Sequence, residues 1–390
     1  MRSGAVRRPA GEARRLILVV VPGDRRHRAL EAAAIRIGGP EIVVLPWWEA
    51  LLRPERLSEI GRAGDWLRVE SPGADPDTWL GLARRGGGGE PVPAGEWRPG
   101  RAWAVGLSAV LAELRAASPT LEWTHDEIED LCDKDVCQRR LSLAGVAVPE
   151  AFAPAAAQGT LRSEELRMLL DKQGVSSVFV KSRWGSSGAG VVAWRRSRGR
   201  EAAWTTAALQ RDAGRDRLVN HKGLRNYTDP RLINALLAPL LRDGVVVQRW
   251  VPKVSATVDG REGEPRSGPF DVRVLVVAGR VTIRVARVGR GPITNLHLDA
   301  ERADADRLLA GLCRREQVFA AAVAAARVFG RHQAVGVDVM VGTDGEVRVI
   351  ECNAWGDQLP GLEFEGLDSA SLQLQALLQR PDGCTEGRWA

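Results

Sequence analysis

The chain has 390 residues, a length that predicts two or three compact domains. Apolar residues make up 44% of it, and its 42 Gly and 21 Pro stay below the share typical of disordered chains, so the composition predicts a globular protein. The formal net charge is +6, and no apolar run approaches the roughly 18 residues that a membrane-spanning helix needs.

The N-terminus and the cysteines bear on the cellular compartment. Arginines precede the apolar run 16–21, as in a signal peptide, but the run ends at Pro22-Gly23-Asp24 without a small-residue cleavage site. The cysteines include no CxxC pair, so we expect reduced thiols rather than disulfides or a zinc site. This pattern predicts a cytoplasmic protein; the cysteines are Cys132, Cys137, Cys313, Cys352 and Cys384.

The first third of the chain begins as a βαβ unit. We expect a buried strand over 16–21, an Ala-rich helix over 26–37 and a second strand over 41–45. This order predicts an N-terminal α/β domain over residues 1–85. A GxGxxG motif is missing between strand and helix, so a dinucleotide-binding domain is not predicted. The Gly- and Pro-rich stretch 86–100 is predicted to be a linker.

Helices and then strands follow the linker. Residues 101–117 alternate like an amphipathic helix, and Thr124 with Glu127 forms a capping-box pattern that predicts another helix up to about residue 144. Hairpin turns between the later segments favour antiparallel sheets with helices on one face, an α+β arrangement. The predicted strands are 178–181, 191–194, 245–251, 272–277, 281–288, 336–341 and 347–352.

The positive charge is concentrated in one window. Residues 195–231 contain ten Arg or Lys and four Asp or Glu, an excess equal to that of the whole chain. This basic insert is either a solvated surface or a docking face for an acidic substrate, and composition favours neither. The docking hypothesis rests on His221, Lys222, Arg225 and Tyr227.

A Gly- and Ser-rich loop lies between the predicted strands 178–181 and 191–194. Glycines allow backbone N–H groups to converge on an anion, and Lys181 at the strand end adds a positive charge. The pattern fits a flap over phosphates, with an ordinary flexible turn as an equal alternative. It is not a Walker A loop, because the lysine precedes the glycines.

Oxygen-bearing side chains meet on the hairpin near residue 350. Strand periodicity places Glu351 and Asn353 on one face, and Asp338 lies on the preceding strand. Carboxylate and amide oxygens without His or Cys suit Mg²⁺ bound together with nucleotide phosphates. The alternative is a solvated acidic hairpin.

An arginine interrupts the apolar hairpin 270–288. Arg273 lies on the face opposite Val272 and Val274, and an arginine in such a setting needs an anionic partner. That partner is either a bound anion or Asp271, which shares its face.

Taken in order, these motifs resemble the ATP-grasp superfamily, with a pattern most similar to the ribosomal-protein glutamate ligase and glutathione-synthetase-like group. The resemblance covers roughly residues 125–365. It implies a pre-ATP-grasp-like N-terminal domain and two subdomains, 101–250 and 251–390, whose antiparallel sheets clamp the nucleotide. The motifs that carry it are Lys134, Lys181 with its loop, Gln248-Arg-Trp-Val251, Asp271-x-Arg273, Asn295-Leu-His and Asp338 with Glu351-x-Asn353.

The resemblance also implies roles for individual residues. Lys134 and Lys181 would hold the phosphates of ATP. Glu351 would bridge one or two Mg²⁺ ions, with Mn²⁺ as an alternative, and Arg273 would stabilise the transferring phosphoryl group. The remaining roles are flap closure by Ser186, Ser187, Gly188 and Gly190, adenine contacts by Gln248, Arg249, Trp250 and Val251, metal binding by Asp338 and Asn353, and support of Arg273 by Arg287 and Asn295.

The activity implied is that of a carboxylate–amine ligase that forms an amide bond through an acyl phosphate. Its partners would be ATP, a carboxylate and an amine, each on a small molecule or a peptide. One alternative is an ATP-grasp kinase that phosphorylates a hydroxyl. Another is a nucleotide-binding regulator that binds an acidic partner or nucleic acid, which the lack of clustered aromatics in the basic insert disfavours.

Overall fold

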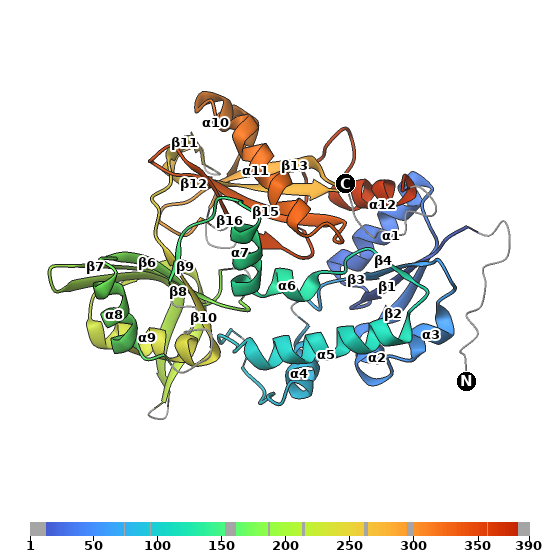
Figure 1. The fold of residues 1–390 in the computed structure, drawn as a ribbon, viewed down its shortest axis with the longest axis horizontal. Helices are drawn as coiled ribbons and strands as arrows, with labels where there is room; N and C mark the ends of the chain where they lie inside the picture. The colour runs from blue at the N-terminus through green and yellow to red at the C-terminus, as the bar shows by residue number, and fades with distance from the viewer. Residues whose placement is uncertain are drawn as a thin grey trace.

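Figure 1 shows the computed structural model, in which three β-sheets carry helices on their faces. Within the part of the chain that the structure describes, every helix is too short or too polar to span a lipid bilayer. The described residues are 13–73, 75–93, 95–152, 161–185, 188–212, 215–260, 264–294, 300–356 and 358–380.

The N-terminal sheet is parallel, and β1 is one of its two inner strands. Leu16, Leu18 and Val20 of β1 pack in one apolar cluster, whereas Ile17 and Val19 pack in another. Alternate residues of a strand point to opposite faces, so both faces of β1 are buried and its sequence is continuously apolar. The order is β2-β1-β3-β4, with β1 (Leu16–Val20), β2 (Ile42–Pro46), β3 (Trp66–Val69) and β4 (Glu122–Trp123).

Helices cover both faces of this sheet. Helix α1 (Arg25–Ile37) begins at Asp24, whose carboxylate accepts a hydrogen bond from the His27 N–H, and ends at Gly38 with φ of 60°. It packs on one face together with α12 (Ser369–Leu378) from the far end of the chain. The predicted βαβ start is therefore confirmed. The other face is covered by α2 (Trp47–Leu52), α3 (Arg56–Ile60), α4 (Pro76–Arg85) and α5 (Arg101–Ala117).

The N-terminal unit reaches beyond the predicted boundary at residue 85, because β4 follows α5 and pairs with β3. The predicted linker 86–100 is packed at both ends. At its start, Gly86 lies against α5, since a Cβ there would lie 1.9 Å from the Ala102 carbonyl oxygen. Towards its end, the Trp97 N–H donates to the Leu218 carbonyl over 2.8 Å.

The second sheet is antiparallel and holds the Gly-rich loop between β6 and β7. Helices α8 (Ser163–Lys172) and α9 (Pro230–Asp243) pack on it through a separate apolar cluster. Most of the basic insert forms the long hairpin β8–β9, which the sequence patterns did not reveal. The order is β5-β10-β6-β7-β8-β9, with β5 (Ala151–Phe152), β6 (Ser177–Ser182), β7 (Val191–Ser197), β8 (Arg200–Asp212), β9 (Arg215–Tyr227) and β10 (Val245–Arg249).

The third sheet is also antiparallel, as predicted. The turn between β12 and β13 contains Ala278 and Gly279 with φ of 47° and 75°, the backbone region that glycine favours. Helices α10 (Ala305–Gly311) and α11 (Arg315–Val328) belong to this unit. Its strands are β11 (Ser255–Asp259), β12 (Pro265–Val277), β13 (Arg280–Val288), β14 (Glu301–Ala303), β15 (Ala334–Val341) and β16 (Val347–Asn353).

One predicted helix differs in the structure. The capping box at Thr124 is absent, because the Thr124 hydroxyl donates to the Leu67 carbonyl and extends the edge of the N-terminal sheet. Two helices then replace the single predicted one, α6 (Ile128–Cys132) and α7 (Lys134–Leu143). Asp133 separates them and caps α7 with its carboxylate. This break puts Lys134 at the first turn of α7.

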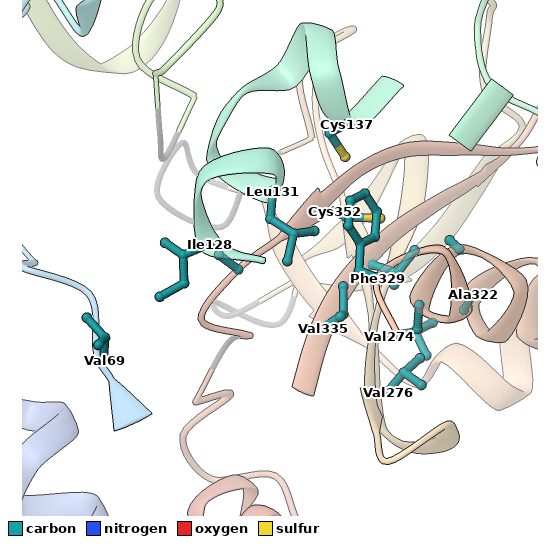
Figure 2. Packing of buried hydrophobic residues seen from close by; sticks show 14 of the residues in the cluster. Val69, Ile128, Leu131, Cys137, Val274, Val276, Ala322, Phe329, Val335 and Cys352 are labelled. Carbon is teal, nitrogen blue, oxygen red and sulfur yellow. The ribbon is translucent and has the colours of Figure 1, made fainter. Parts of the chain in front are cut away.

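The main apolar core joins the N-terminal unit to the third sheet. Figure 2 shows Leu131 of α6, Cys137 of α7 and Phe329 around Cys352 of β16, and all four belong to one apolar cluster. All four side chains are at least nine-tenths buried. The residue next to Cys352 on either side is a predicted metal ligand, so this core supports the strand that carries them.

A buried histidine pair lies where β4 meets the segment before β15. The rings of His125 and His332 have centroids 4.5 Å apart. Burial lowers the pKa of His125 well below its usual range, with the charges of Arg68 and Arg26 contributing. Burial lowers the pKa of His332 to about 3, although its hydrogen bond to the Ala354 carbonyl opposes the shift.

Acid is therefore expected to destabilise the fold. Both folded-state pKa values lie below the unfolded value of about 6.5, so below that pH the unfolded chain binds more protons. We expect the free energy of unfolding, measured with urea, to fall by about 1.4 kcal/mol per pH unit for each histidine between about pH 6 and pH 4. His332→Gln should flatten this slope, and His221→Gln, at an exposed position on β9, should not. An unchanged slope in the His332 variant would contradict this account.

Candidate active site

A cleft of about 770 Å³ lies between the second and third sheets and continues to the N-terminal unit. Most of the predicted site residues line it, although they come from distant parts of the chain. Those that line the cleft are Lys134, Lys181, Gly188, Gln248, Arg249, Val251, Arg273, Arg287, Asp338, Glu351 and Asn353. Ser186, Ser187 and Asn295 lie outside the described residues.

Lys134 connects the Gly-rich loop between β6 and β7 to the third sheet. Its ammonium donates a hydrogen bond to the Gly185 carbonyl in the Gly-rich loop. The same Nζ lies 3.9 Å from Oε2 of Glu351 on β16. The start of α7 thus holds a cation between the two sheets.

Lys181 is a buried cation at the end of β6, with 8% of its surface exposed. Burial lowers its pKa to about 8, and the nearby charges of Lys134 and Lys253 act in the same direction. The carboxylate of Glu351 opposes this shift. Because the buried ammonium is poorly solvated, an anion that binds in the cleft would stabilise its charged form strongly.

The described part of the Gly-rich loop requires glycine. Gly188 and Gly190 have φ of 76° and 68°. A Cβ on Gly190 would lie 2.8 Å from Nε1 of Trp97 and 2.9 Å from Cβ of Ser182, so a side chain there would force the loop away. The loop backbone therefore lies close to the neighbouring chain at the cleft wall.

Strand register brings the predicted metal ligands together. Asp338 of β15 lies opposite Glu351 of β16, and Asn353 lies opposite Gly336. The Asn353 amide donates to the Gly336 carbonyl over 3.2 Å, which leaves its oxygen as the acceptor end. Glu351 is ionised more readily than usual, because its pKa is lowered by Lys134 and other cations although burial opposes this.

Asp338 also holds both arginines of the hairpin β12–β13. Arg273 donates through Nε and Nη2 to the two carboxylate oxygens, with the Nη2 bond at 2.9 Å. Nη2 of Arg287 lies 3.0 Å from Oδ2 of the same carboxylate. The register of β12 with β15 explains this pairing, since Arg273 and Asp338 are direct cross-strand neighbours.

Asp271 is not the partner of Arg273, which was one of the two alternatives left open. Its carboxylate accepts from Arg287 over 2.7 Å and from Lys253 over 2.8 Å, because β12–β13 register places it opposite Arg287. The Thr294 hydroxyl donates to it as well. Although burial opposes ionisation, Arg287 and Lys253 lower the pKa of Asp271.

The donor set fits a magnesium ion. Two carboxylates and one amide oxygen are hard ligands, and Mg²⁺ commonly completes its shell with water and phosphate oxygens. Within the described residues, no cluster of three or more His, Cys, Asp or Glu side chains is placed to hold a metal. Asp338, Glu351 and Asn353 would supply the protein ligands.

In the segment predicted to contact adenine, Gln248 and Trp250 are placed differently. Gln248 is 2% exposed, lines the cleft, and leaves its Oε1 without a hydrogen-bond partner among the described residues. The Trp250 ring instead packs 5.5 Å from Phe179 and 5.6 Å from Trp204, outside the cleft lining. The Trp250 side chain therefore belongs to an aromatic group on the second sheet, and Trp250 is not among the residues that line the cleft.

Some cleft residues were not predicted. Lys253 lines the cleft and binds Asp271. The sequence feature that could have identified it is that lysines are rare in this Arg-rich chain. Trp97, from the supposed linker, lines the cleft beside the flap. In the basic insert, Asn220 lines the cleft, whereas His221, Arg225 and Tyr227 do not, and the Lys222 side chain lies outside the described part.

Removing the Asp338 carboxylate is expected to weaken the fold as well as the site. Asp338→Ala takes a buried carboxylate away from two buried guanidinium groups, and breaking such pairs costs about 3 kcal/mol. Urea unfolding should show this loss, with a smaller one for Asp338→Asn, which keeps the shape and the hydrogen-bond acceptor. Equal stability of Asp338→Ala and wild type would show that the carboxylate does not stabilise the fold.

Comparisons with known proteins agree with this architecture. No protein-family model matches the sequence, and no curated protein matches it significantly. A crystal structure of the D-cycloserine synthetase DcsG aligns with a TM-score of 0.53 and 18% identity, over 93% of this chain and 98% of that one.

Two further solved structures align over most of this chain. The ATP-grasp ligase PsnB, complexed with a minimal precursor, aligns with a TM-score of 0.50 and 18% identity, over 94% of this chain and 99% of its own. The ADP complex of PurK, an N5-carboxyaminoimidazole ribonucleotide synthetase, gives 0.56 and 13%, over 94% and 78%. The three-sheet arrangement with its interposed cleft is therefore the ATP-grasp fold, and this chain has it.

Proposed function

We propose that this chain is an ATP- and Mg²⁺-dependent carboxylate–amine ligase that forms an amide or peptide bond through an acyl phosphate. The observation that carries the proposal is the convergence of cations and oxygen ligands at one end of the cleft. The cations are Lys134, Lys181, Arg273 and Arg287, and the oxygen ligands are Asp338, Glu351 and Asn353.

In this proposal the second sheet holds the nucleotide. Lys134 and Lys181 bind the phosphates by charge-assisted hydrogen bonds. The backbone of the Gly-rich loop, with Gly188 and Gly190, covers them, and the segment from Gln248 to Val251 contacts the adenine. Of these residues, Gly188, Gln248, Arg249 and Val251 line the cleft. The orphaned Oε1 of Gln248 supports a polar ligand at that end of the cleft.

The third sheet carries out the transfer. Asp338, Glu351 and Asn353 would hold Mg²⁺, which would supply positive charge to neutralise the phosphates. Arg273 and Arg287 stabilise the negative charge on the transferring phosphoryl group. A substrate carboxylate oxygen attacks the γ-phosphorus, ADP leaves, and an amine then displaces phosphate from the acyl phosphate. Closure of the loop excludes water, which would otherwise hydrolyse that intermediate.

The test is ATP turnover with Mg²⁺ in the presence of pooled acids, amino acids and amines. ADP, phosphate and new product masses are measured together. Release of ADP and phosphate with a condensed product is the expected result. A stable phosphoester would instead identify a kinase, and ATP binding without turnover in any pool would favour a nucleotide-binding regulator. The predicted cytoplasmic location and the use of Mn²⁺ stay predictions.

A further inference from the structure

The predicted metal ligand Asn353 is the last residue of β16, and the chain turns directly after it. The Gly356 N–H donates to the Asn353 carbonyl over 3.3 Å, and Gly356 has a φ of 54°. A Cβ on Gly336 would lie 3.2 Å from the Gly356 Cα, so the turn packs on the residue whose carbonyl accepts from the Asn353 amide. The orientation of the Asn353 side chain therefore depends on how the turn 354–356 is held.

The N-terminal unit contacts this turn through side-chain hydrogen bonds in both directions. Nη1 of Arg26, at the start of α1, donates to the Trp355 carbonyl over 2.9 Å. In return, Nε1 of Trp355 donates to the carbonyl of Val69, the last residue of β3, over 3.0 Å. Arg26 and the residues 353–356 all line the cleft, so these bonds lie at the cleft wall.

Glu70, the residue after β3, holds Arg26 in place. Its side chain is 1% exposed, and its Oε2 accepts from the same Nη1 of Arg26 over 3.3 Å. Its Oε1 accepts from Nε of Arg68 over 2.6 Å. Although burial opposes ionisation, Arg68 and Arg26 lower the pKa of Glu70. One nitrogen of Arg26 thus joins a buried, ionised carboxylate to the turn.

This arrangement fixes a direction more than it stabilises the fold. A buried ion pair gains little over apolar packing of the same volume, because both charges lose their hydration. A guanidinium, however, donates along fixed directions in one plane. Glu70 therefore sets the direction in which Arg26 donates. Arg26 in turn sets the position of the Trp355 carbonyl, two residues from Asn353.

We infer that Glu70 and Arg26 are positioning residues of the candidate active site, which hold the turn 354–356 and thereby orient Asn353 for the metal ion. The inference rests on the proposed function, because it concerns how that ligase would hold Mg²⁺. Both residues act through the turn rather than by contact with the ion. The N-terminal unit would thus contribute to the metal site although it supplies none of the proposed ligands.

The main test is the Mg²⁺ dependence of ADP binding, measured by titration calorimetry on the full chain. In Arg26→Gln, we expect the Mg²⁺ concentration that gives half of the maximal increase in ADP affinity to rise about tenfold, a loss typical of residues that orient a metal ligand. ADP affinity without Mg²⁺ should not change, whereas a purely structural role would weaken ADP binding with and without Mg²⁺ alike. Arg26→Lys, which keeps the charge, should recover part of the loss. The control Arg28→Gln, at an exposed position on the same helix outside the cleft lining, should match wild type.

A second set of variants tests the route through Asn353. Because Arg26 is inferred to act through that side chain, Arg26→Gln should have no further effect on the Mg²⁺ dependence in a chain that carries Asn353→Ala. Glu70→Gln should resemble Arg26→Gln, and the two together should lose no more than either alone. Hydrogen exchange of the segment 350–356 in the metal-free chain should be faster in both single variants. An unchanged Mg²⁺ dependence in Arg26→Gln, or an equal effect with and without the Asn353 side chain, would overturn the inference.

The inference and the proposed function fail in different ways. A shift of the Mg²⁺ dependence that requires Asn353, without ATP turnover in any substrate pool, would refute the ligase and leave the positioning role standing. ATP-dependent condensation by the wild type, with the same Mg²⁺ dependence in Arg26→Gln as in Arg28→Gln, would do the reverse.

Discussion

Glu351→Gln is expected to abolish Mg²⁺-dependent ATP turnover while the protein stays folded. The Glu351 carboxylate lies across the strand pair from Asp338 and 3.9 Å from Lys134, the lysine that bonds to the Gly-rich loop. Gln keeps the shape but removes the charge that a dication requires. We expect kcat to fall about a thousandfold, equivalent to about 4 kcal/mol of transition-state stabilisation.

Glu351 tests the metal site more sharply than Asp338 does. The Glu351 side chain is 30% exposed, whereas Asp338 is buried and binds two guanidinium groups. A loss of activity in an Asp338 variant could therefore come from a damaged metal site or from a destabilised fold. The matched control is Glu346→Gln, an exposed glutamate at the turn of the same hairpin, which should keep full activity. Mg²⁺-dependent turnover in Glu351→Gln near the wild-type rate would remove the residue from the metal site.

Sequence reasoning succeeded where burial itself sets the pattern. The strands near 16–20, 178–181 and 347–352 are rich in Val, Ile and Leu, and each forms a strand within a residue or two of its prediction. It failed where tertiary contacts decide the local structure. Thr124 is adjacent to a strand because it bonds to Leu67, a residue 57 positions away.

The long hairpin β8–β9 was missed because its outer residues are charged and its alternation is weak. Within 200–227, Arg, Asp and Asn interrupt the apolar positions, so the composition suggests a solvated insert. The structure shows that Ala203, Ala207 and Leu218 are nevertheless buried against α9 and the second sheet. Small residues bury little area each, and their strand pattern is correspondingly faint.

The candidate site shows the same division. The residue types and their order were enough to select Lys134, Lys181, Asp338 and Glu351, which do meet in one cleft. Their pairing was not predictable, because the partner of each arginine follows from β12 lying between β13 and β15. That register sends Arg273 to Asp338. It could not be deduced from the hairpin sequence alone.

Lys181→Met is expected to lower activity and raise stability together. Burial lowers the pKa of Lys181 to about 8, below the roughly 10.4 of an exposed lysine. The charged ammonium is therefore less stable in the folded protein than in the unfolded chain. Methionine fills a similar volume without charge. At pH 7 we expect the variant to gain on the order of 2 kcal/mol in free energy of unfolding, and to lose about a hundredfold in kcat/KM for ATP.

The pH dependence separates this explanation from a general packing effect. Between about pH 8 and 10.4 the unfolded wild-type chain binds more protons at this lysine than the folded chain does, so wild-type stability should rise with pH across that window. Lys181→Met should lack this rise, and the gain it shows at pH 7 should shrink toward pH 10. Lys172→Met, at an exposed site in the last turn of α8, is the control and should leave stability, its pH dependence and ATP turnover unchanged. A Lys181 variant that is less stable than wild type at pH 7 would show that the ammonium is held by the protein's own carboxylates rather than kept for a bound phosphate.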